Sequence, residues 1–228
     1  MLIHYYIPLY NITKELIPDL GSRKILDFGC NCGIFLETAE ESFPHENYTG
    51  IDICEDAIDI ARKNFPSANF IYYDGSNPEY NPGGKESLPT LEDKFDLILV
   101  SSVFTHTSKE EMLRIIDWMI DHLSESGQIL ISWTGYDPSF DRFPYGPVRD
   151  QILRFFPEHK SMDYCYVVNY SDNGKNKTTI TQSFPTYPVL GLWTFYNVEY
   201  FQKLLESYDT KFILSRDWKQ DMVIISRS

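Results

Sequence analysis

Ile25-Leu-Asp-Phe-Gly-Cys-Asn-Cys-Gly33 is the stretch of sequence that decides the fold. It begins as a short apolar run, which predicts a buried strand, and it continues into a turn that contains two glycines. The residues after the turn carry apolar side chains at helical spacing. Glycines at such a strand-to-helix junction let a ligand approach the backbone, because a Cβ would block it. We therefore expect a nucleotide-like ligand at this turn.

The segments around the turn alternate between strand-like and helix-like patterns. The strand-like runs are short and rich in β-branched residues, and the helix-like runs are amphipathic. Such alternation is typical of βαβ units around a parallel sheet. The pattern predicts strands at 23–27, 48–52, 69–74, 95–100 and 128–132, helices at 33–43 and 55–65, and a closing helix at 198–207 followed by a hairpin of strands 211–215 and 222–226.

A third helix of the alternating part is predicted to begin at Thr107-Ser-Lys-Glu110. This stretch resembles a capping box, in which a Thr side chain and a Glu three residues later close the first helical turn. A wide apolar stripe follows, which indicates that one face of the helix is buried. The stripe consists of Met112, Leu113, Ile116, Met119, Ile120 and Leu123.

Two regions of the chain lack a clear period. Residues 75–94 are polar and rich in Pro, Gly and Asn, which predicts a mobile surface loop. Residues 133–190 are rich in aromatic residues, prolines and charges, and we expect an insertion or lid there. One helix is predicted within that insertion, near 148–156.

The glycine spacing separates this turn from the dinucleotide-binding fingerprint. That fingerprint has glycines at its first, third and sixth positions, whereas Gly29 is followed here by Asn31 and Ile34 at the corresponding places. The sequence therefore argues against a nicotinamide cofactor.

The same stretch closely resembles the first motif of the class I S-adenosylmethionine-dependent methyltransferases, Asp-x-Gly-Cys-Gly-x-Gly. Asp27, Gly29, Cys30 and Gly33 match the motif, and Asn31 replaces its middle glycine. The resemblance implies one α/β domain over 1–228, with 133–190 as a lid or substrate-binding insertion. It implies a Rossmann-like, doubly wound sheet of seven strands whose last strand is antiparallel, with helices on both faces and an aromatic-rich insertion after the fifth strand.

Acidic residues follow the next two predicted strands. Asp52 ends the second strand 19 residues after Gly33, where a carboxylate can accept both ribose hydroxyls. Asp74 ends the third strand, and the resemblance implies that it accepts from the adenine amino group. The fourth strand runs into a segment that, in the family, lies under the methionine part of the cofactor. The cofactor-binding residues implied in this way are Asp27, Gly29, Cys30, Asn31, Gly33, Asp52, Ile53, Asp74, Gly75, Ser76, Ser101 and Ser102.

His106 is the histidine best placed to act as a general base, because it lies just past the fourth predicted strand. A histidine just before a helix can also serve only to order the turn. Tyr136, Asp137 and His159 are further candidates from the insertion. Aromatic residues of that region either line an acceptor pocket or form a satellite core or a dimer face. The residues predicted to bind the acceptor are Tyr136, Phe140, Tyr145 and Trp193.

No metal is expected. Cys30 and Cys32 form a Cys-x-Cys pair, but a zinc site would need two further ligands at motif spacing. The metal-dependent branch of the family has acidic ligands just after the fourth strand, where this chain has Ser101 and Ser102. The resemblance therefore implies S-adenosylmethionine as the cofactor, with S-adenosylhomocysteine as its product.

The composition limits the partners of the protein. A formal net charge of −13 would repel a phosphate backbone, so nucleic acid and anionic membrane are poor partners. The first ten residues do not resemble a signal peptide, and no apolar run approaches the length of a membrane helix. Four cysteines are too few for a disulfide scaffold. We expect a soluble cytoplasmic protein. The insertion is the surface through which a homodimer would form.

The expected function is methyl transfer from S-adenosylmethionine to a small molecule, with oxygen of a metabolite, natural product or sugar preferred over nitrogen. Two alternatives stay open. One is a module that binds the cofactor without catalysis, as a sensor or partner subunit. The other is an aminopropyl transferase or a nicotinamide-dependent oxidoreductase on a similar sheet.

Overall fold

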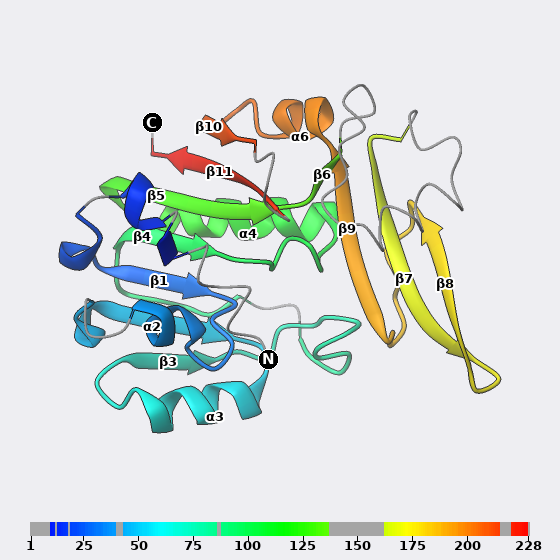
Figure 1. Cartoon of the computed structure of the whole chain (residues 1–228), viewed down its shortest axis with the longest axis horizontal. Coiled ribbons are helices and arrows are strands. Elements are labelled where there is room, and N and C mark those ends of the chain that lie inside the picture. The colour runs from blue at the N-terminus through cyan, green and yellow to red at the C-terminus, as the bar shows by residue number, and fades with distance from the viewer. Residues whose placement is uncertain are drawn as a thin grey trace.

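In the part of the chain that the computed structural model describes, the fold consists of two β-sheets, a larger sheet of seven strands and a smaller sheet of four (Figure 1). The larger sheet lies on the left of Figure 1 and the smaller sheet on the right. The structure describes residues 10–11, 13–17, 19–39, 43–85, 88–136, 162–214 and 220–227.

The larger sheet contains the strands that the alternating pattern predicts, together with the closing hairpin. Across the sheet the strands follow the order β10 (Asp209–Ile213), β11 (Asp221–Ser226), β5 (Leu123–Trp133), β4 (Phe95–Val100), β1 (Ile25–Phe28), β2 (Tyr48–Asp52) and β3 (Asn69–Tyr72). The strands from β1 to β5 pair in parallel, whereas β11 is antiparallel to both of its neighbours. The predicted Rossmann-like sheet with an antiparallel last strand is confirmed.

The strand order places a switch point beside β1. β2 follows β1 in the chain and pairs with one of its edges, whereas β4 pairs with the other edge. Open α/β sheets bind ligands at such a point, in the crevice outside the carboxyl ends of the strands. The glycine turn, which directly follows β1, lies at this edge of the sheet.

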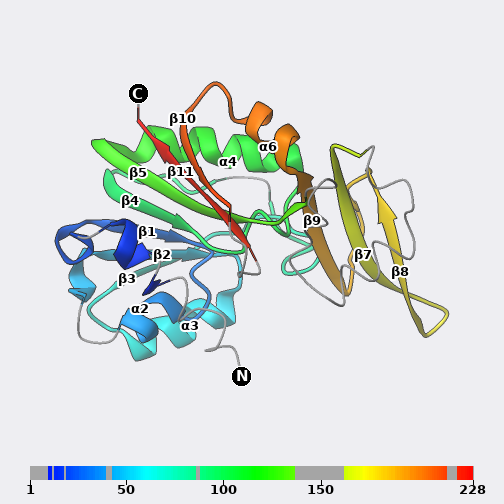
Figure 2. The same ribbon diagram turned by 45° about the horizontal axis from the view of Figure 1, so that its top comes forward.

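Helices cover both faces of the larger sheet, as predicted (Figure 2). α2 (Ile34–Ala39) and α3 (Glu55–Asn64) lie on one face, and α4 (Lys109–His122) and α6 (Val198–Leu204) lie on the other. Alternate residues of β4 enter the two resulting cores, since Leu97 and Leu99 belong to one hydrophobic cluster and Ile98 and Val100 to the other. This double burial explains why apolar residues of β4 point to both faces of the sheet.

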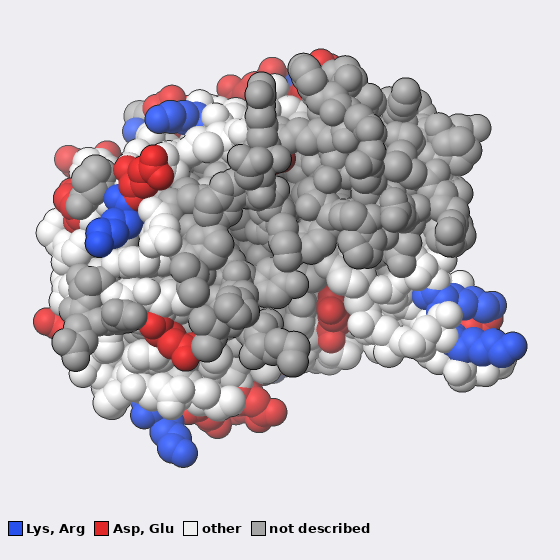
Figure 3. Space-filling view, viewed as in Figure 1, with Lys and Arg blue, Asp and Glu red and all other residues white. Residues whose placement is uncertain are grey.

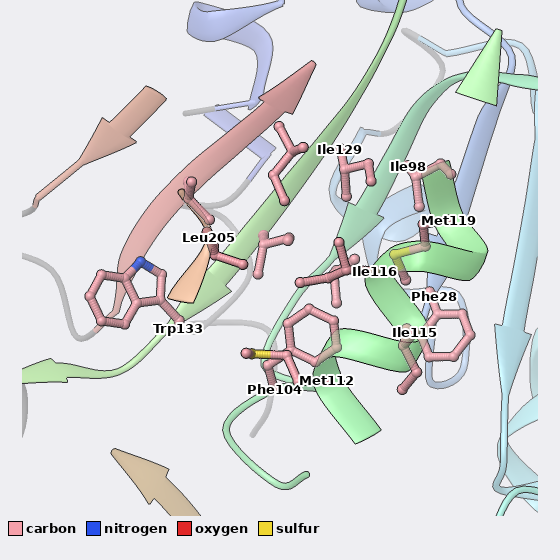
Figure 4. Packing of buried hydrophobic residues seen from close by; sticks show 14 of the residues in the cluster. Phe28, Ile98, Phe104, Met112, Ile115, Ile116, Met119, Ile129, Trp133 and Leu205 are labelled. Atoms are coloured by element: carbon pink, nitrogen blue, oxygen red, sulfur yellow. The ribbon is translucent and has the colours of Figure 1, made fainter. Parts of the chain in front are cut away.

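The core beneath α4 is shown in Figure 4. Met112, Ile115, Ile116 and Met119 of α4 are buried in it. The helix begins one residue later than the predicted capping box, because the side chain of Ser108 and not that of Thr107 accepts the N-cap hydrogen bond, from the Glu111 backbone N–H at 3.0 Å. The predicted pair Thr107–Glu110 was therefore wrong by one position.

The smaller sheet is the part of the architecture that the sequence patterns did not reveal. Its strand order is β6 (Gly135–Tyr136), β9 (Gly191–Asn197), β7 (Tyr164–Asp172) and β8 (Lys175–Thr181). The sheet lies beyond the carboxyl ends of the parallel strands (Figure 1). Three of its strands, β6, β7 and β8, fall within the predicted insertion 133–190, and β9 directly follows it. The helix predicted near 148–156 falls outside the described residues.

Burial on both faces hides the period of β7. Cys165 and Val167 pack in one hydrophobic cluster, and Tyr166 and Val168 pack in a second cluster. A strand buried on both faces shows a continuous apolar run, which sequence periodicity does not distinguish from other buried segments. The aromatic-rich stretch therefore lacked a recognisable strand pattern.

The surface shows no large area of positive charge among the described residues in view. Figure 3 shows Lys and Arg side chains in small groups, with Asp and Glu side chains beside several of them. None of the helices described by the structure combines the length and apolar character needed to cross a membrane.

Candidate cofactor and acceptor site

The turn after β1 has a backbone that few residue types adopt readily. Gly29 and Gly33 have positive φ angles of 84° and 82°, and Asn31 between them has a φ of 51°. Glycine populates this region freely, and asparagine tolerates it better than most residues. A Cβ on Gly29 would lie 2.3 Å from Cγ2 of Val103. The structure therefore requires a glycine at position 29, and the turn keeps a bare backbone there.

Asp52 braces this turn from the end of β2. Its Oδ2 accepts a hydrogen bond from the Asn31 backbone N–H at 2.8 Å, and its Oδ1 accepts from the Cys54 N–H at 2.9 Å. Burial raises the pKa of Asp52, and these backbone hydrogen bonds act in the opposite direction. Each carboxylate oxygen keeps a second lone pair for a ligand hydroxyl. The structure thus brings Asp52 against the glycine turn.

Asp27 supports the same turn from the interior of the sheet. Its side chain is buried, and the Tyr48 hydroxyl donates a hydrogen bond to its Oδ2 at 2.5 Å. Burial raises the pKa of Asp27 to about 7, the Tyr48 hydrogen bond lowers it in part, and the nearby Asp52 raises it further. Cys30 is also buried, and burial raises the pKa of its thiol.

The segment after β3 adds a second carboxylate to this edge. Oδ1 of Asp74 accepts hydrogen bonds from the Tyr72 hydroxyl at 3.3 Å and from the Asn81 amide at 3.1 Å. A Cβ on Gly75 would lie 2.9 Å from Cγ2 of Ile53, so the ends of β2 and β3 approach each other closely here. The structure therefore brings Ile53, Asp74 and Gly75, three residues of the predicted cofactor-binding set, to one place.

The segment after β4 is held by its neighbours on the other side of β1. Ser102 has a φ of 59°, and its backbone N–H donates to the Ser132 hydroxyl at 2.8 Å. Its own hydroxyl lies 2.8 Å from the amide nitrogen of Gln220. Ser102 is thus fixed between β5 and the start of β11, directly after Ser101.

His106 lies at a junction between the two sheets. We call this place the sheet junction and define it as residues 77–80, 105–107 and 191–194. Nδ1 of His106 lies 3.2 Å from Oε2 of Glu79, and the Asn77 amide donates to the His106 carbonyl at 3.0 Å. The ring of Tyr80 contacts the imidazole edge-on, with the centroids 5.3 Å apart. The histidine is therefore held by the loop after β3.

The smaller sheet completes the sheet junction through β9. The Thr194 backbone N–H donates to the Thr105 carbonyl at 2.7 Å, and the Thr194 hydroxyl donates to the Thr107 carbonyl at 2.8 Å. The ring centroid of Trp193 lies 6.5 Å from that of His106. The structure therefore brings two of the predicted residues, His106 and Trp193, side by side.

The other residues predicted to bind the acceptor are placed differently. Tyr136 is buried on β6, where its hydroxyl donates to the Met162 carbonyl and burial raises the pKa of its hydroxyl above the ordinary range. Phe140 and Tyr145 lie outside the described residues, as do Asp137 and His159, the further candidates for the base.

A cavity of about 400 Å³ opens between the loop after β3, the start of α4 and the loop before β9. Its walls combine proline and aromatic side chains with hydroxyl and charged groups, a mixture common in pockets for small molecules. Ser76 links this cavity to the predicted adenine side of the site. The lining includes Ser76, Pro78, Ser108, Arg114, Phe184 and Tyr187.

Glu79 and Asn77 are the site residues that sequence reasoning missed. Both lie in the stretch 75–94, which lacks a period and was expected to be a mobile surface loop. In the structure the start of this stretch is instead fixed by hydrogen bonds. Asn77 is buried, and its Oδ1 accepts from the Glu79 and Tyr80 backbone N–H groups at 2.9 and 3.1 Å.

Among the described residues, no group of three or more His, Cys, Asp or Glu side chains is arranged to hold a metal ion.

Comparison with known proteins agrees with this geometry. A family model described as a methyltransferase domain matches residues 8–163, which is more than half of the chain. The chain therefore belongs to the methyltransferase-domain family. The predicted resemblance to the class I S-adenosylmethionine-dependent methyltransferases is confirmed, and the predicted cofactor agrees with it.

Two of the curated relatives each match a little more than half of the chain. The chain is 28% identical over 134 residues to an uncharacterised protein of Rickettsia prowazekii, a match that covers 57% of this chain and 52% of the relative. It is 27% identical over 131 residues to a malonyl-[acyl-carrier protein] O-methyltransferase of Bacillus cereus, covering 57% of this chain and 44% of the relative. The chain spans about half the length of the curated relatives it matches.

Two solved structures share the fold along the whole chain. The S-adenosylmethionine-bound amino pentose methyltransferase CalS10 of Micromonospora echinaspora superimposes with a TM-score of 0.59 at 15% identity, covering 100% of this chain and 92% of that one. The magnesium protoporphyrin IX methyltransferase of Synechocystis, with bound S-adenosylhomocysteine, gives a TM-score of 0.57 at 14% identity, covering 100% and 84%. At these identities the likeness concerns the fold.

Proposed function

We propose that this chain transfers a methyl group from S-adenosylmethionine to an oxygen atom of a small-molecule acceptor. The observation that carries the proposal is the hydrogen bond between the Asp52 carboxylate and the backbone of the glycine turn, at the switch point of the sheet. A carboxylate and a bare backbone at the ends of two adjacent parallel strands suit a nucleoside with free ribose hydroxyls. The family assignment supports the same conclusion.

The cofactor would lie across the carboxyl ends of β1, β2 and β4. Asp52 would accept the ribose hydroxyls, and Ile53 would pack against the adenine. Asp74, with Gly75 and Ser76, would bind the edge of the adenine. The residues that would surround the methionine part are Asp27, Gly29, Cys30, Asn31 and Gly33 of the turn, with Ser101 and Ser102 after β4.

The side chains of the sheet junction would serve the acceptor. S-adenosylmethionine supplies a methyl group on a sulfonium, which is already an activated electrophile. The chain then has to align the acceptor and, for a hydroxyl acceptor, to remove a proton. We assign proton removal to the imidazole of His106, and acceptor contact to Trp193 beside it. Tyr136, Phe140 and Tyr145 complete the proposed acceptor set.

The preference for oxygen has one specific support. Several curated relatives are named malonyl-[acyl-carrier protein] O-methyltransferases. The net charge of −13 favours a small acceptor over a nucleic acid. We further propose that residues 1–228 act as one cytoplasmic domain, with any homodimer formed through the insertion 133–190.

Calorimetry and a turnover assay test the proposal together. We expect S-adenosylhomocysteine to bind with one site per chain, and NAD and decarboxylated S-adenosylmethionine to bind weakly or not at all. Incubation of the chain with S-adenosylmethionine and a panel of carboxylic acids, phenols, sugars and amino sugars should release S-adenosylhomocysteine. Tight binding without turnover on any panel member would favour the non-catalytic module, and preference for NAD or the decarboxylated compound would contradict the cofactor assignment.

Two variants connect the assay to the residues. Asp52→Ala should weaken S-adenosylhomocysteine binding by roughly tenfold to a hundredfold, because hydrogen bonds to a charged group are lost. Asp59→Ala, which removes an exposed carboxylate from α3, is the matched control and should bind normally. With a phenol or sugar hydroxyl as the acceptor, His106→Ala should lower turnover by about a hundredfold with the binding of S-adenosylhomocysteine retained. A loss of turnover below about tenfold would exclude His106 as the base.

A further inference from the structure

One oxygen atom of Glu79 contacts two segments that lie far apart in the sequence. Oε2 accepts a hydrogen bond from the Leu192 backbone N–H at 2.9 Å, and the same atom lies 3.2 Å from Nδ1 of His106. The side chains of Glu79 and His106 are only 18% and 17% exposed, so water competes little for this contact. Neither sequence spacing nor any motif pointed to Glu79.

The chemistry of these partners determines where the imidazole hydrogen lies. A backbone N–H can only donate, so Oε2 of Glu79 is an acceptor at Leu192. An ionised carboxylate has no hydrogen to donate, and Nδ1 of His106 must therefore carry the hydrogen of their shared bond. A neutral imidazole with a hydrogen on Nδ1 has a free lone pair on Nε2.

We propose that Glu79 is a positioning residue that holds His106 in the Nδ1–H tautomer and thereby makes Nε2 the proton acceptor. The catalytic use of this arrangement rests on the proposed function of His106 as the base. Glu79 acts only through His106, by orienting its ring and selecting its tautomer.

The surroundings hold both members of the pair. Asn77 accepts from the Glu79 backbone N–H through Oδ1 and donates to the His106 carbonyl through Nδ2, so one buried side chain positions both backbones. The rings of Tyr80 and Trp193 flank the imidazole. The geometry of the pair is therefore set by three segments at once, the loop after β3, the segment after β4 and β9.

Two substitutions of Glu79 separate tautomer selection from a purely structural contact. In Glu79→Gln, the Leu192 N–H requires an acceptor, so the amide oxygen takes the place of Oε2 and still accepts from Nδ1 of His106. In Glu79→Leu, the acceptor is lost and no group selects the tautomer. Glu125→Gln and Glu125→Leu, at an exposed position on β5, are the matched controls.

Nitrogen NMR of the full-length, ¹⁵N-labelled protein reads the tautomer directly. At about pH 9, well above the ordinary histidine pKa, the ring of a neutral histidine gives distinct shifts for its protonated and unprotonated nitrogens. His106→Ala assigns the signals. We expect an unprotonated Nε2 in the wild type, in Glu79→Gln and in both controls. In Glu79→Leu we expect a hydrogen on Nε2 or a mixture of tautomers.

Turnover on a hydroxyl acceptor of the panel, a phenol or a sugar, gives the second readout, because an ionised carboxylate oxygen needs no base. Glu79→Leu should lower kcat by roughly tenfold or more, while Glu79→Gln retains most of the activity and both variants bind S-adenosylhomocysteine like the wild type. A hydrogen on Nε2 in the wild type, or an unchanged tautomer in Glu79→Leu, would overturn the assignment. Full turnover in His106→Ala would instead refute the proposed base, with the NMR result standing, so the two failures are distinguishable.

Discussion

The glycine turn and the sheet junction lie at the same edge of the larger sheet, but the chain holds them in different ways. The turn is held by pairs such as Asn31 with Asp52, which are 21 positions apart. The junction is held by Glu79 with Leu192, which are 113 positions apart, and by Thr194 with Thr107, which are 87 apart. The turn thus depends on its local backbone, whereas the junction exists only when the two sheets are in place.

This difference predicts two kinds of sensitivity. A change in the turn should act through backbone strain and steric overlap, since Gly29 and Gly33 adopt positive φ angles. A change in the sheet junction should act through buried polar groups that lose their partners, which cost free energy when unsatisfied. The four substitutions below test this contrast.

Gly29→Ala should have the largest effect. The new Cβ would overlap Cγ2 of Val103 at 2.3 Å, and alanine is strained at a φ of 84°. We expect a loss of roughly 3 kcal/mol in the free energy of unfolding, with loss of S-adenosylhomocysteine binding. Urea unfolding and calorimetry measure the two effects. Gly83→Ala is the control, because a Cβ there meets no atom within 4 Å; equal behaviour of the two variants would contradict the strain argument.

Asn77→Ala should have the next largest effect, on the sheet junction. Three backbone groups lose their partner, the Glu79 and Tyr80 N–H groups and the His106 carbonyl. We expect a loss of about 2 kcal/mol in the free energy of unfolding. Hydrogen exchange should show faster opening at 77–80 and at β9 than at the glycine turn. Asn176→Ala, at an exposed position of β8, should match the wild type. If hydrogen exchange in Asn77→Ala were faster by the same factor over the whole chain, the sheet junction would not be a separate unit.

Asp27→Asn should change the pH dependence of stability. The pKa of Asp27 is raised to about 7 in the folded protein, against about 3.9 in an unfolded chain. Between about pH 4 and pH 7 the folded protein binds a proton that the unfolded chain does not, so this group makes the free energy of unfolding fall as the pH rises. The slope contributed by Asp27 is at most roughly 1.4 kcal/mol per pH unit.

Urea unfolding of the cofactor-free protein at several pH values checks this prediction. The Asp27→Asn curve should be flatter than that of the wild type through the window, because asparagine does not titrate and its amide oxygen can still accept from Tyr48. Asp59→Asn, on the exposed side of α3, should keep the wild-type slope. Parallel curves for the wild type and Asp27→Asn would refute the raised pKa.

Thr194→Val should have the smallest effect. Valine matches the shape of threonine but cannot donate to the Thr107 carbonyl, which is bonded at 2.8 Å in the folded protein. We expect a loss of about 1 kcal/mol, seen as a small shift of the urea midpoint. Thr90→Val, at an exposed position, should not shift it. Faster hydrogen exchange confined to β9 in Thr194→Val would support the contrast between the glycine turn and the sheet junction. A higher urea midpoint in this variant would contradict that contrast.

The sequence allowed prediction where residues are related by local pattern. The strands of the larger sheet, the glycine turn and the positions of Asp52 and Asp74 follow from runs of apolar residues and from glycines that a tight turn needs. Each of these features depends on residues that are adjacent in the sequence or that belong to the next strand along the chain. The capping residue of α4 was misplaced by one position, because Thr107 and Ser108 can both accept the same kind of hydrogen bond.

The sheet junction could not be predicted for the same physical reason. Glu79 acquires its partners only when the loop after β3 meets both the segment after β4 and β9. The order of residues within 75–94 contains no pattern that indicates these contacts. The smaller sheet was also hidden, because β7 is buried on both faces and shows no alternation of polar and apolar residues.

The position of β11 has a consequence for the order of folding. β11 lies between β5 and β10, yet the ribosome makes both of those strands first. The hydrogen-bonding edge of β5 must therefore wait for a strand synthesised more than eighty residues later. A nascent chain stalled before Asp221 would present that apolar edge to chaperones or to other chains. Insertion of β11 between β5 and β10 removes this internal edge and leaves β10 and β3 as the edges of the larger sheet.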